Sequence, residues 1–184
     1  QVYKTSPYER YDELGELDVS SGEDGDSSTI MNRLQDGHAA NQAAIARVQA
    51  ALDRSGLQVL VRPQPTKREA ATVDLVISVG GDGTFLATAQ RVRDAVMLGV
   101  NSAPGSSVGH YCGTDAVGFE EALDELLSGE AEIATLGRID IRIGHRACPL
   151  LALNDVLFAN RSPACSSRYI LKAAAQEASV SYTH

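Results

Sequence analysis

The most informative part of the sequence is the stretch VDLVISVGGDGT at residues 73–84. Its first seven residues form a nearly continuous apolar run, which is typical of a parallel strand that is covered on both faces. The glycine-rich turn Gly80-Gly81-Asp82-Gly83-Thr84 follows directly, and we expect a helix from about residue 85 to residue 93. Because open α/β sheets bind ligands just beyond the carboxyl ends of their strands, this turn indicates a ligand site.

The segments on either side predict an α/β fold with an open, parallel, Rossmann-like sheet. Helical spacing of apolar residues predicts a helix over 29–54, and the alternation of Leu57, Val59 and Val61 predicts a strand. We further expect a second buried strand over 95–100, an amphipathic helix over 119–127 and a short first strand within 1–8. This β-α-β-α order is that of a parallel sheet.

The pattern changes to that of antiparallel strands near residue 136. Ile139, Ile141 and Ile143 alternate with polar residues, and further strands are expected over 150–158 and 168–171. We therefore predict an α/β nucleotide-binding domain over 1–135, followed by the start of an antiparallel β domain over 136–184. The closing stretch, residues 173–184, has the composition of a linker or an altered end.

The negative charge of the chain is concentrated in one segment. The 184 residues carry a net charge of −8, and the eight acidic residues and one basic residue between positions 9 and 26 account for 7 of these charges. Residues 12–28 are rich in glycine, serine and acids, which predicts a mobile acidic loop. The acidity argues against nucleic acid and anionic membranes as partners.

The cysteines and the termini bear on the compartment. Three cysteines without metal-ligand spacing predict no disulfide and no protein metal site, and favour a reducing, cytoplasmic location. No apolar run approaches the roughly 20 residues that a membrane span needs. The sequence begins with Gln1, so we expect the true start to be missing and keep a mitochondrial location as the alternative.

The glycine-rich turn contains the residue types that phosphate binding and phosphoryl transfer need. Gly80, Gly81 and Gly83 allow backbone N–H groups to approach phosphate oxygens, and Thr84 is expected to cap the following helix. Asp82 would repel phosphate unless its carboxylate accepts a proton from an attacking hydroxyl or positions Mg²⁺. The alternative is a tight turn in which Asp82 is merely solvated.

Three stretches in order resemble the NAD kinase family: DLVISVGGDGTFLATA at 74–89, MLGVN at 97–101 and LNDV at 153–156. The segment GHYC at 109–112, together with YKTSPYE at 3–9, is similar to the branch of mitochondrial-type NAD kinases and plant-type NADH kinases. The GGDGT turn alone is shared with diacylglycerol and sphingosine kinases, so the flanking stretches decide between these families.

The resemblance implies a two-domain enzyme with its site between the domains. Such enzymes use Mg²⁺ to transfer a phosphoryl group from ATP, or in some members polyphosphate, to the adenosine ribose 2′-hydroxyl of NAD or NADH, giving NADP(H). By position, Asp82 would be the general base. The implied phosphate and nucleotide contacts are Gly80, Gly81, Gly83, Thr84, Asn101, Asn154 and Asp155.

Some features remain open at the level of sequence. The family has Asn-Glu where this chain has Asn154-Asp155, a pair that could also be a polar break between strands. His110 either contacts substrate or lies on the surface, and Arg138 either pairs with phosphate or is solvated. The family continues through a Gly-Ser-Thr segment, so we expect this chain to be incomplete at its C-terminus. Family members are usually dimers or tetramers, which predicts a homo-oligomer.

Two other functions are alternatives to an NAD(H) kinase. One is a lipid kinase of the same superfamily, of the diacylglycerol or sphingosine type. The other is a truncated, non-catalytic nucleotide-binding module.

Overall fold

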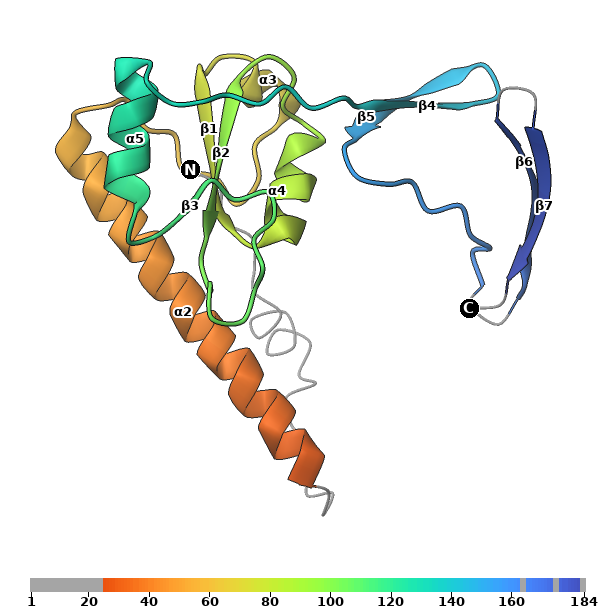
Figure 1. Cartoon of the computed structure of the whole chain (residues 1–184), viewed down its shortest axis with the longest axis horizontal. Coiled ribbons are helices and arrows are strands. Elements are labelled where there is room, and N and C mark those ends of the chain that lie inside the picture. Colours follow the sequence, from red (N-terminus) through yellow and green to blue (C-terminus); the bar gives the residue numbers. More distant parts are fainter. Residues whose placement is uncertain (1–24, 163–164, 174–175, 183–184) are drawn as a thin grey trace. The chain divides into compact units, whose positions relative to one another are not determined.

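A three-stranded parallel sheet carries the candidate site (Figure 1). Strand β1 (Leu75–Gly80) pairs with β2 (Val96–Asn101) from Leu75 opposite Val96 to Gly80 opposite Asn101. The short strand β3 (Thr114–Asp115) continues the sheet on the other side of β2. The computed structural model describes residues 25–162, 165–173 and 176–182. Within them, the predicted parallel α/β sheet is confirmed.

Helices cover both faces of this sheet. Helices α2 (Gly25–Ser55) and α5 (Phe119–Ser128) lie on one face, and α4 (Asp82–Ala89) lies on the other (Figure 1). A short helix, α3 (Lys67–Ala70), precedes β1. Alternate residues of β1 point to opposite faces, so the apolar run is buried on both sides, as predicted. The larger core cluster consists of Ala44, Val48, Ala51, Leu52, Ile77, Val79, Leu98, Val100, Phe119 and Leu123.

Antiparallel strands follow the parallel sheet, as the sequence predicts. Strand β4 (Ile139–Ile143) pairs with β5 (Arg146–Ala152), and β6 (Ser167–Ala173) pairs with β7 (Gln176–Tyr182). The chain consists of two compact units, residues 1–153 and residues 154–184, and the pair β6–β7 belongs to the second. The predicted division into domains at residue 135 stays a prediction.

The helix α2 begins earlier than predicted. Its first residue is Gly25, so the last four residues of the predicted acidic loop are helical and that part of the prediction is wrong. Aspartate and serine are favoured at helix beginnings, and residues 26–28 are of these types. The rest of the predicted loop, residues 12–24, and the predicted strand within 1–8 lie outside the described residues.

The strand predicted at Leu57, Val59 and Val61 is absent from the described structure. These residues form no strand, because alternation alone does not supply a neighbour to pair with. Helix α4 ends at Ala89 and not at residue 93.

Two boundaries in the antiparallel part were also predicted wrongly. Strand β5 spans Arg146–Ala152 rather than 150–158, because Ile143 pairs with Arg146 and leaves a two-residue turn. Gly144, with φ of 59°, provides the positive dihedral angle that such a turn needs. The predicted C-terminal linker contains β7, whose pairing partner β6 could not be read from local composition.

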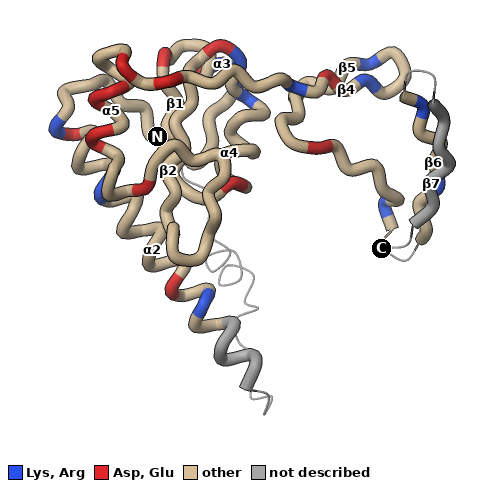
Figure 2. Tube along the Cα trace, viewed as in Figure 1, with Lys and Arg blue, Asp and Glu red and all other residues tan. Residues whose placement is uncertain are grey.

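Acidic side chains gather on α5, where Figure 2 shows a group of red segments. Glu120 and Glu121 lie in its first turn, where a negative charge favours the helix dipole. Glu120 also pairs with Arg54 of α2. None of the helices in the described part of the chain is long and apolar enough to cross a membrane.

We predict that Phe119→Ala lowers the free energy of unfolding by about 3–5 kcal/mol, because its ring is almost fully buried in the core. The matched control is Leu127→Ala on the same helix, where 55% of the side chain is exposed and the loss should stay below about 1 kcal/mol. Urea unfolding measures both. Equal losses would contradict this account of the core.

Candidate functional site

The glycine-rich turn joins β1 to α4 at the carboxyl edge of the sheet. Gly81 is the N-cap of α4, and its carbonyl oxygen accepts hydrogen bonds from the N–H groups of Thr84 at 3.0 Å and Phe85 at 3.2 Å. Asp82 is therefore the first residue of the helix. The prediction that Thr84 caps the helix is wrong, because Thr84 lies within the first turn and Gly81 provides no side-chain cap.

Gly80 is required by the conformation of the turn. Its φ is 154°, and a Cβ atom at this position would lie 2.4 Å from Oγ1 and 2.7 Å from Cβ of Thr84. A Cβ on Gly81 would lie 2.9 Å from Oγ of Ser107. Gly83 differs, because it is exposed and a Cβ there would have nothing within 4 Å. The first two glycines thus permit close packing, whereas the third leaves open space at the helix start.

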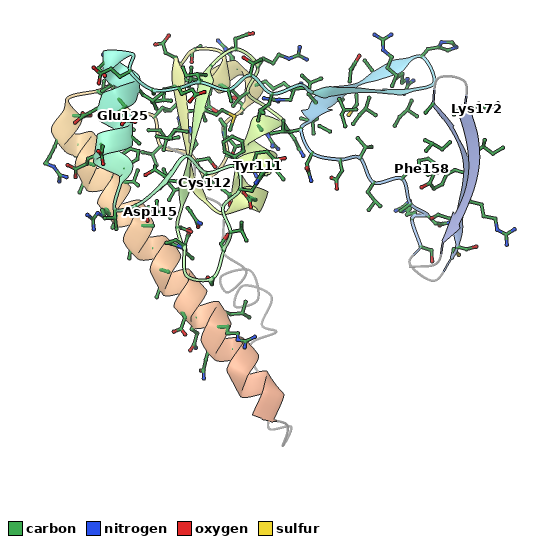
Figure 3. The ribbon with its side chains drawn as sticks, in the orientation of Figure 1. Tyr111, Cys112, Asp115, Glu125, Phe158 and Lys172 are labelled. Carbon is green, nitrogen blue, oxygen red and sulfur yellow. The ribbon has the colours of Figure 1, made fainter. Side chains whose placement is uncertain are left out.

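The Asp82 carboxylate is held by the backbone of a distant loop. The N–H of Tyr111 donates a hydrogen bond of 2.8 Å to Oδ1 of Asp82, and the thiol of Cys112 donates to the carbonyl oxygen of Gly80 at 3.7 Å. Figure 3 shows Tyr111 and Cys112 between the strands and α4. Asp82 is partly buried, so its side chain is fixed rather than free in solvent.

Asn101 lies beside this turn, opposite Gly80 in the pairing of β1 with β2. Its side chain is buried, and its amide hydrogen-bonds within the following loop, to the carbonyl oxygen of Ser107 and the N–H of Ala103. The structure therefore brings Asn101 together with the glycine-rich turn, while its predicted contact with the nucleotide stays a prediction.

Aromatic side chains lie next to Asp82. The rings of Phe85 and Tyr111 are stacked, with centroids 5.6 Å apart and planes 5° apart, and the ring of His110 meets Tyr111 edge-on at 5.0 Å. All three residues line a cavity of about 820 Å³, whose lining includes neither Asp82 nor the glycines of the turn. His110 is exposed. Phe85 and Tyr111 were not predicted from sequence as site residues, and only their proximity to the GGDGT and GHYC segments could have suggested them.

The thiol of Cys112 is sensitive to the same carboxylate. Burial, and secondarily the negative charge of Asp82, raise the pKa of Cys112 to about 11. The group is consequently a neutral thiol near pH 7. No cluster of three or more His, Cys, Asp or Glu side chains suited to a metal occurs among the described residues.

Three other predicted residues belong to other segments of the chain. Asn154 and Asp155 are exposed. They are the first two residues of the unit 154–184, whereas Asp82 belongs to the unit 1–153. They follow the end of β5 and do not interrupt a strand. The guanidinium of Arg138, which is partly exposed, donates to the carbonyl oxygen of Ala89, a contact that neither of the two alternatives for Arg138 included. The C-terminal carbonyl groups of a helix attract such cations.

A parallel α/β sheet with a glycine-rich turn at its carboxyl edge is typical of open-sheet proteins that bind phosphate groups at this edge. Comparison with known families gives the narrower assignment. Residues 38–131, just over half of the chain, match the ATP-NAD kinase N-terminal domain. The chain belongs to the NAD kinase family. This membership removes the basis for the lipid kinase alternative.

Individual relatives agree with this assignment. The probable NADH kinase of Oryza sativa subsp. japonica is 32% identical over 157 residues, which cover 76% of this chain and 48% of the relative. The NADH kinase of Arabidopsis thaliana is 37% identical over 39% of this chain and 27% of the relative. The human mitochondrial NAD kinase 2 is 33% identical over 70% of this chain and 32% of the relative. The chain thus spans about half, or less, of the length of these relatives.

We predict that Gly80→Ala lowers the free energy of unfolding by about 1–3 kcal/mol, because its backbone conformation and the contact with Thr84 both oppose a Cβ atom. The matched variant Gly83→Ala meets no atom and occupies a helical position, so it should change stability by about 1 kcal/mol or less. Chemical denaturation compares the two. Equal destabilisation would contradict the described turn.

We also predict that iodoacetamide modifies Cys112 far more slowly than the exposed Cys165 at pH 8, because a pKa of about 11 leaves only about 0.1% thiolate. Asp82→Asn removes the negative charge, which lowers the pKa of Cys112 and should raise its rate, while the rate at Cys165 stays constant. Peptide mass spectrometry follows each site. An unchanged rate at Cys112 in the variant would show that the carboxylate does not act on it.

Proposed function

We propose that the protein transfers the terminal phosphoryl group of ATP to the adenosine ribose 2′-hydroxyl of NAD or NADH, giving NADP(H). The observation that carries this proposal is the Asp82 carboxylate, held by the Tyr111 N–H at the start of α4. Membership of the NAD kinase family supports the same reaction.

The first turn of α4 suits the phosphate chain of ATP. The N–H groups of Thr84 and Phe85 are used by the carbonyl of Gly81, which leaves the amides of Asp82 and Gly83 as the donors at the positive end of the helix. The open space at Gly83 allows a phosphate oxygen to approach them. Thr84 adds a hydroxyl in the same turn.

Asp82 acts as the general base in this proposal. One carboxylate oxygen is bound by Tyr111, so Oδ2 is the atom that accepts the proton of the 2′-hydroxyl. The hydroxyl oxygen forms a new bond to the γ-phosphorus as the bond between that phosphorus and the bridging oxygen breaks, and ADP leaves with the electron pair. Phosphoryl transfer depends mainly on the positioning of the reacting groups. One fixed carboxylate and several backbone N–H donors are therefore sufficient protein groups for the reaction.

The site is compatible with Mg²⁺. Proteins usually bind this ion through substrate phosphates together with one or two carboxylates, and because both oxygens of Asp82 are assigned here, the phosphates of ATP would hold the ion. When bound, the ion would neutralise charge on the phosphate oxygens.

We propose that the rings of Phe85, His110 and Tyr111 contact the nucleotide acceptor, because they belong to α4 and to the loop segment that binds Asp82. We propose that Asn154 and Asp155 hold its ribose, as the resemblance implies, with the shorter Asp155 in place of glutamate. The relatives from rice and Arabidopsis are named NADH kinases, which favours NADH as an acceptor. The name of the human relative favours the mitochondrial alternative over the predicted cytoplasmic location. A homodimer or homotetramer stays a prediction.

We predict that Asp82→Asn reduces kcat/KM for NADP(H) formation by about 100-fold or more while the fold is retained, because the amide oxygen still accepts the Tyr111 N–H but no longer accepts a proton. The full-length protein is assayed with ATP and either NAD or NADH. Asp74→Asn, a change at the exposed residue just before β1, is the control and should retain activity.

Three outcomes, from the activity assay and from calorimetry, lead to different conclusions. Full activity in Asp82→Asn would remove the general-base role. Nucleotide binding by calorimetry without turnover in the unmodified protein would favour the non-catalytic module. Loss of activity in Asp74→Asn as well would show that the assay responds to any change in charge.

A further inference from the structure

The loop that follows β2 connects Asn101 to the residue that binds Asp82. It leaves the sheet at Ser102, whose N–H donates to the carbonyl oxygen of Gly80 at 3.2 Å. It then turns back, with the N–H of Ser107 donating to the carbonyl oxygen of Ala103 at 2.9 Å. Its far end places the Tyr111 N–H on Asp82. The position of that donor therefore depends on the shape of residues 102–112.

The side chain of Asn101 lies inside this loop. Its Nδ2 donates to the carbonyl oxygen of Ser107 at 2.9 Å, and its Oδ1 accepts from the N–H of Ala103 at 3.1 Å. Asn101 is only 6% exposed. Both ends of the amide are thus used to join two points of the loop, and the group is enclosed.

Gly109 packs against the same amide. Its φ is 63°, and a Cβ atom there would lie 2.4 Å from Nδ2 and 2.9 Å from Cγ of Asn101. Only glycine combines this backbone conformation with so close an approach. Gly109 is followed at once by His110 and Tyr111, so the contact with Asn101 fixes the start of the segment that reaches Asp82.

We propose that Asn101 is a positioning residue, which holds residues 102–112 in the shape that delivers the Tyr111 N–H to Asp82 and makes no contact with the nucleotide. This inference rests on the proposed kinase function for its effect on rate. It changes the role that resemblance assigns to Asn101, from nucleotide contact to support of the general base. The buried amide has the correct donor and acceptor for the loop, which neither aspartate nor alanine would provide.

Asn101→Asp is the sharpest variant, because it keeps the size and the acceptor atom but loses the donor to Ser107. We expect kcat to fall by about 10-fold or more, with KM for ATP and for NADH changed by less than about threefold, because an interaction confined to the transition state is lost. A rise in KM with kcat unchanged would overturn the inference, since it would place Asn101 on the nucleotide.

Two glycines of the same loop provide a matched pair. Gly109→Ala should lower kcat as Asn101→Asp does, because the added methyl group would clash with the side-chain amide of Asn101. Gly105→Ala is the control, since Gly105 is exposed and a Cβ there has nothing within 4 Å. The double variant Asn101→Asp/Gly109→Ala should lose no more activity than the worse of the two single variants, because the effects of contacting residues are non-additive. Multiplicative losses would show that the two residues act separately.

Hydrogen exchange separates this inference from the kinase proposal. Without nucleotide, the Tyr111 amide should exchange about 10-fold faster or more in Asn101→Asp and Gly109→Ala than in the unmodified protein, while the amides of β1 keep their rates. If Asn101→Asp fails to fold, the exchange rate of the Tyr111 amide in Gly109→Ala tests the same inference. An unmodified protein without kinase activity, but with this exchange pattern, would refute only the proposed function. Unchanged exchange at Tyr111 would refute the positioning role.

Discussion

The hydrogen bond from the Tyr111 N–H to the Asp82 carboxylate joins the two halves of the site. One half is the glycine-rich turn between β1 and α4, and the other is the loop after β2. The parallel pairing of β1 with β2 ends both strands at the same edge, with Gly80 opposite Asn101, so the two segments must meet there. The carboxylate is consequently placed at the positive end of a helix in a fixed orientation.

Much of the fold could be predicted because its signals are local. The run at 75–79 is apolar except at Ser78, and the structure buries it on both faces between α4 and the helices α2 and α5. The helix at Phe119–Ser128 was predicted almost to the residue, since its apolar stripe is clear and Gly129 ends it with φ of 79°. The errors fell where pairing decides the outcome. Strand β7 needs β6, and residues 57–61 alternate without forming a strand in the described structure.

The site was predictable to a smaller extent. The turn and Asp82 follow from the sequence because strand, glycines and helix are adjacent along the chain. The partner of Asp82 does not, since Tyr111 lies 29 residues away and acts through its backbone N–H, which every residue other than proline has. Thr84 has a residue type suited to capping, yet Gly81 takes the cap position. Asn154 and Asp155 stay predictions, because they belong to the unit of residues 154–184.

Amide exchange at Tyr111, measured in Asp82→Asn and Asp82→Ala, tests the central claim most directly. The account predicts a protected amide in the unmodified protein, protection retained in Asp82→Asn, where an oxygen still accepts the hydrogen bond, and protection lost in Asp82→Ala. A Tyr111 amide that exchanges at the same rate in all three proteins would contradict it.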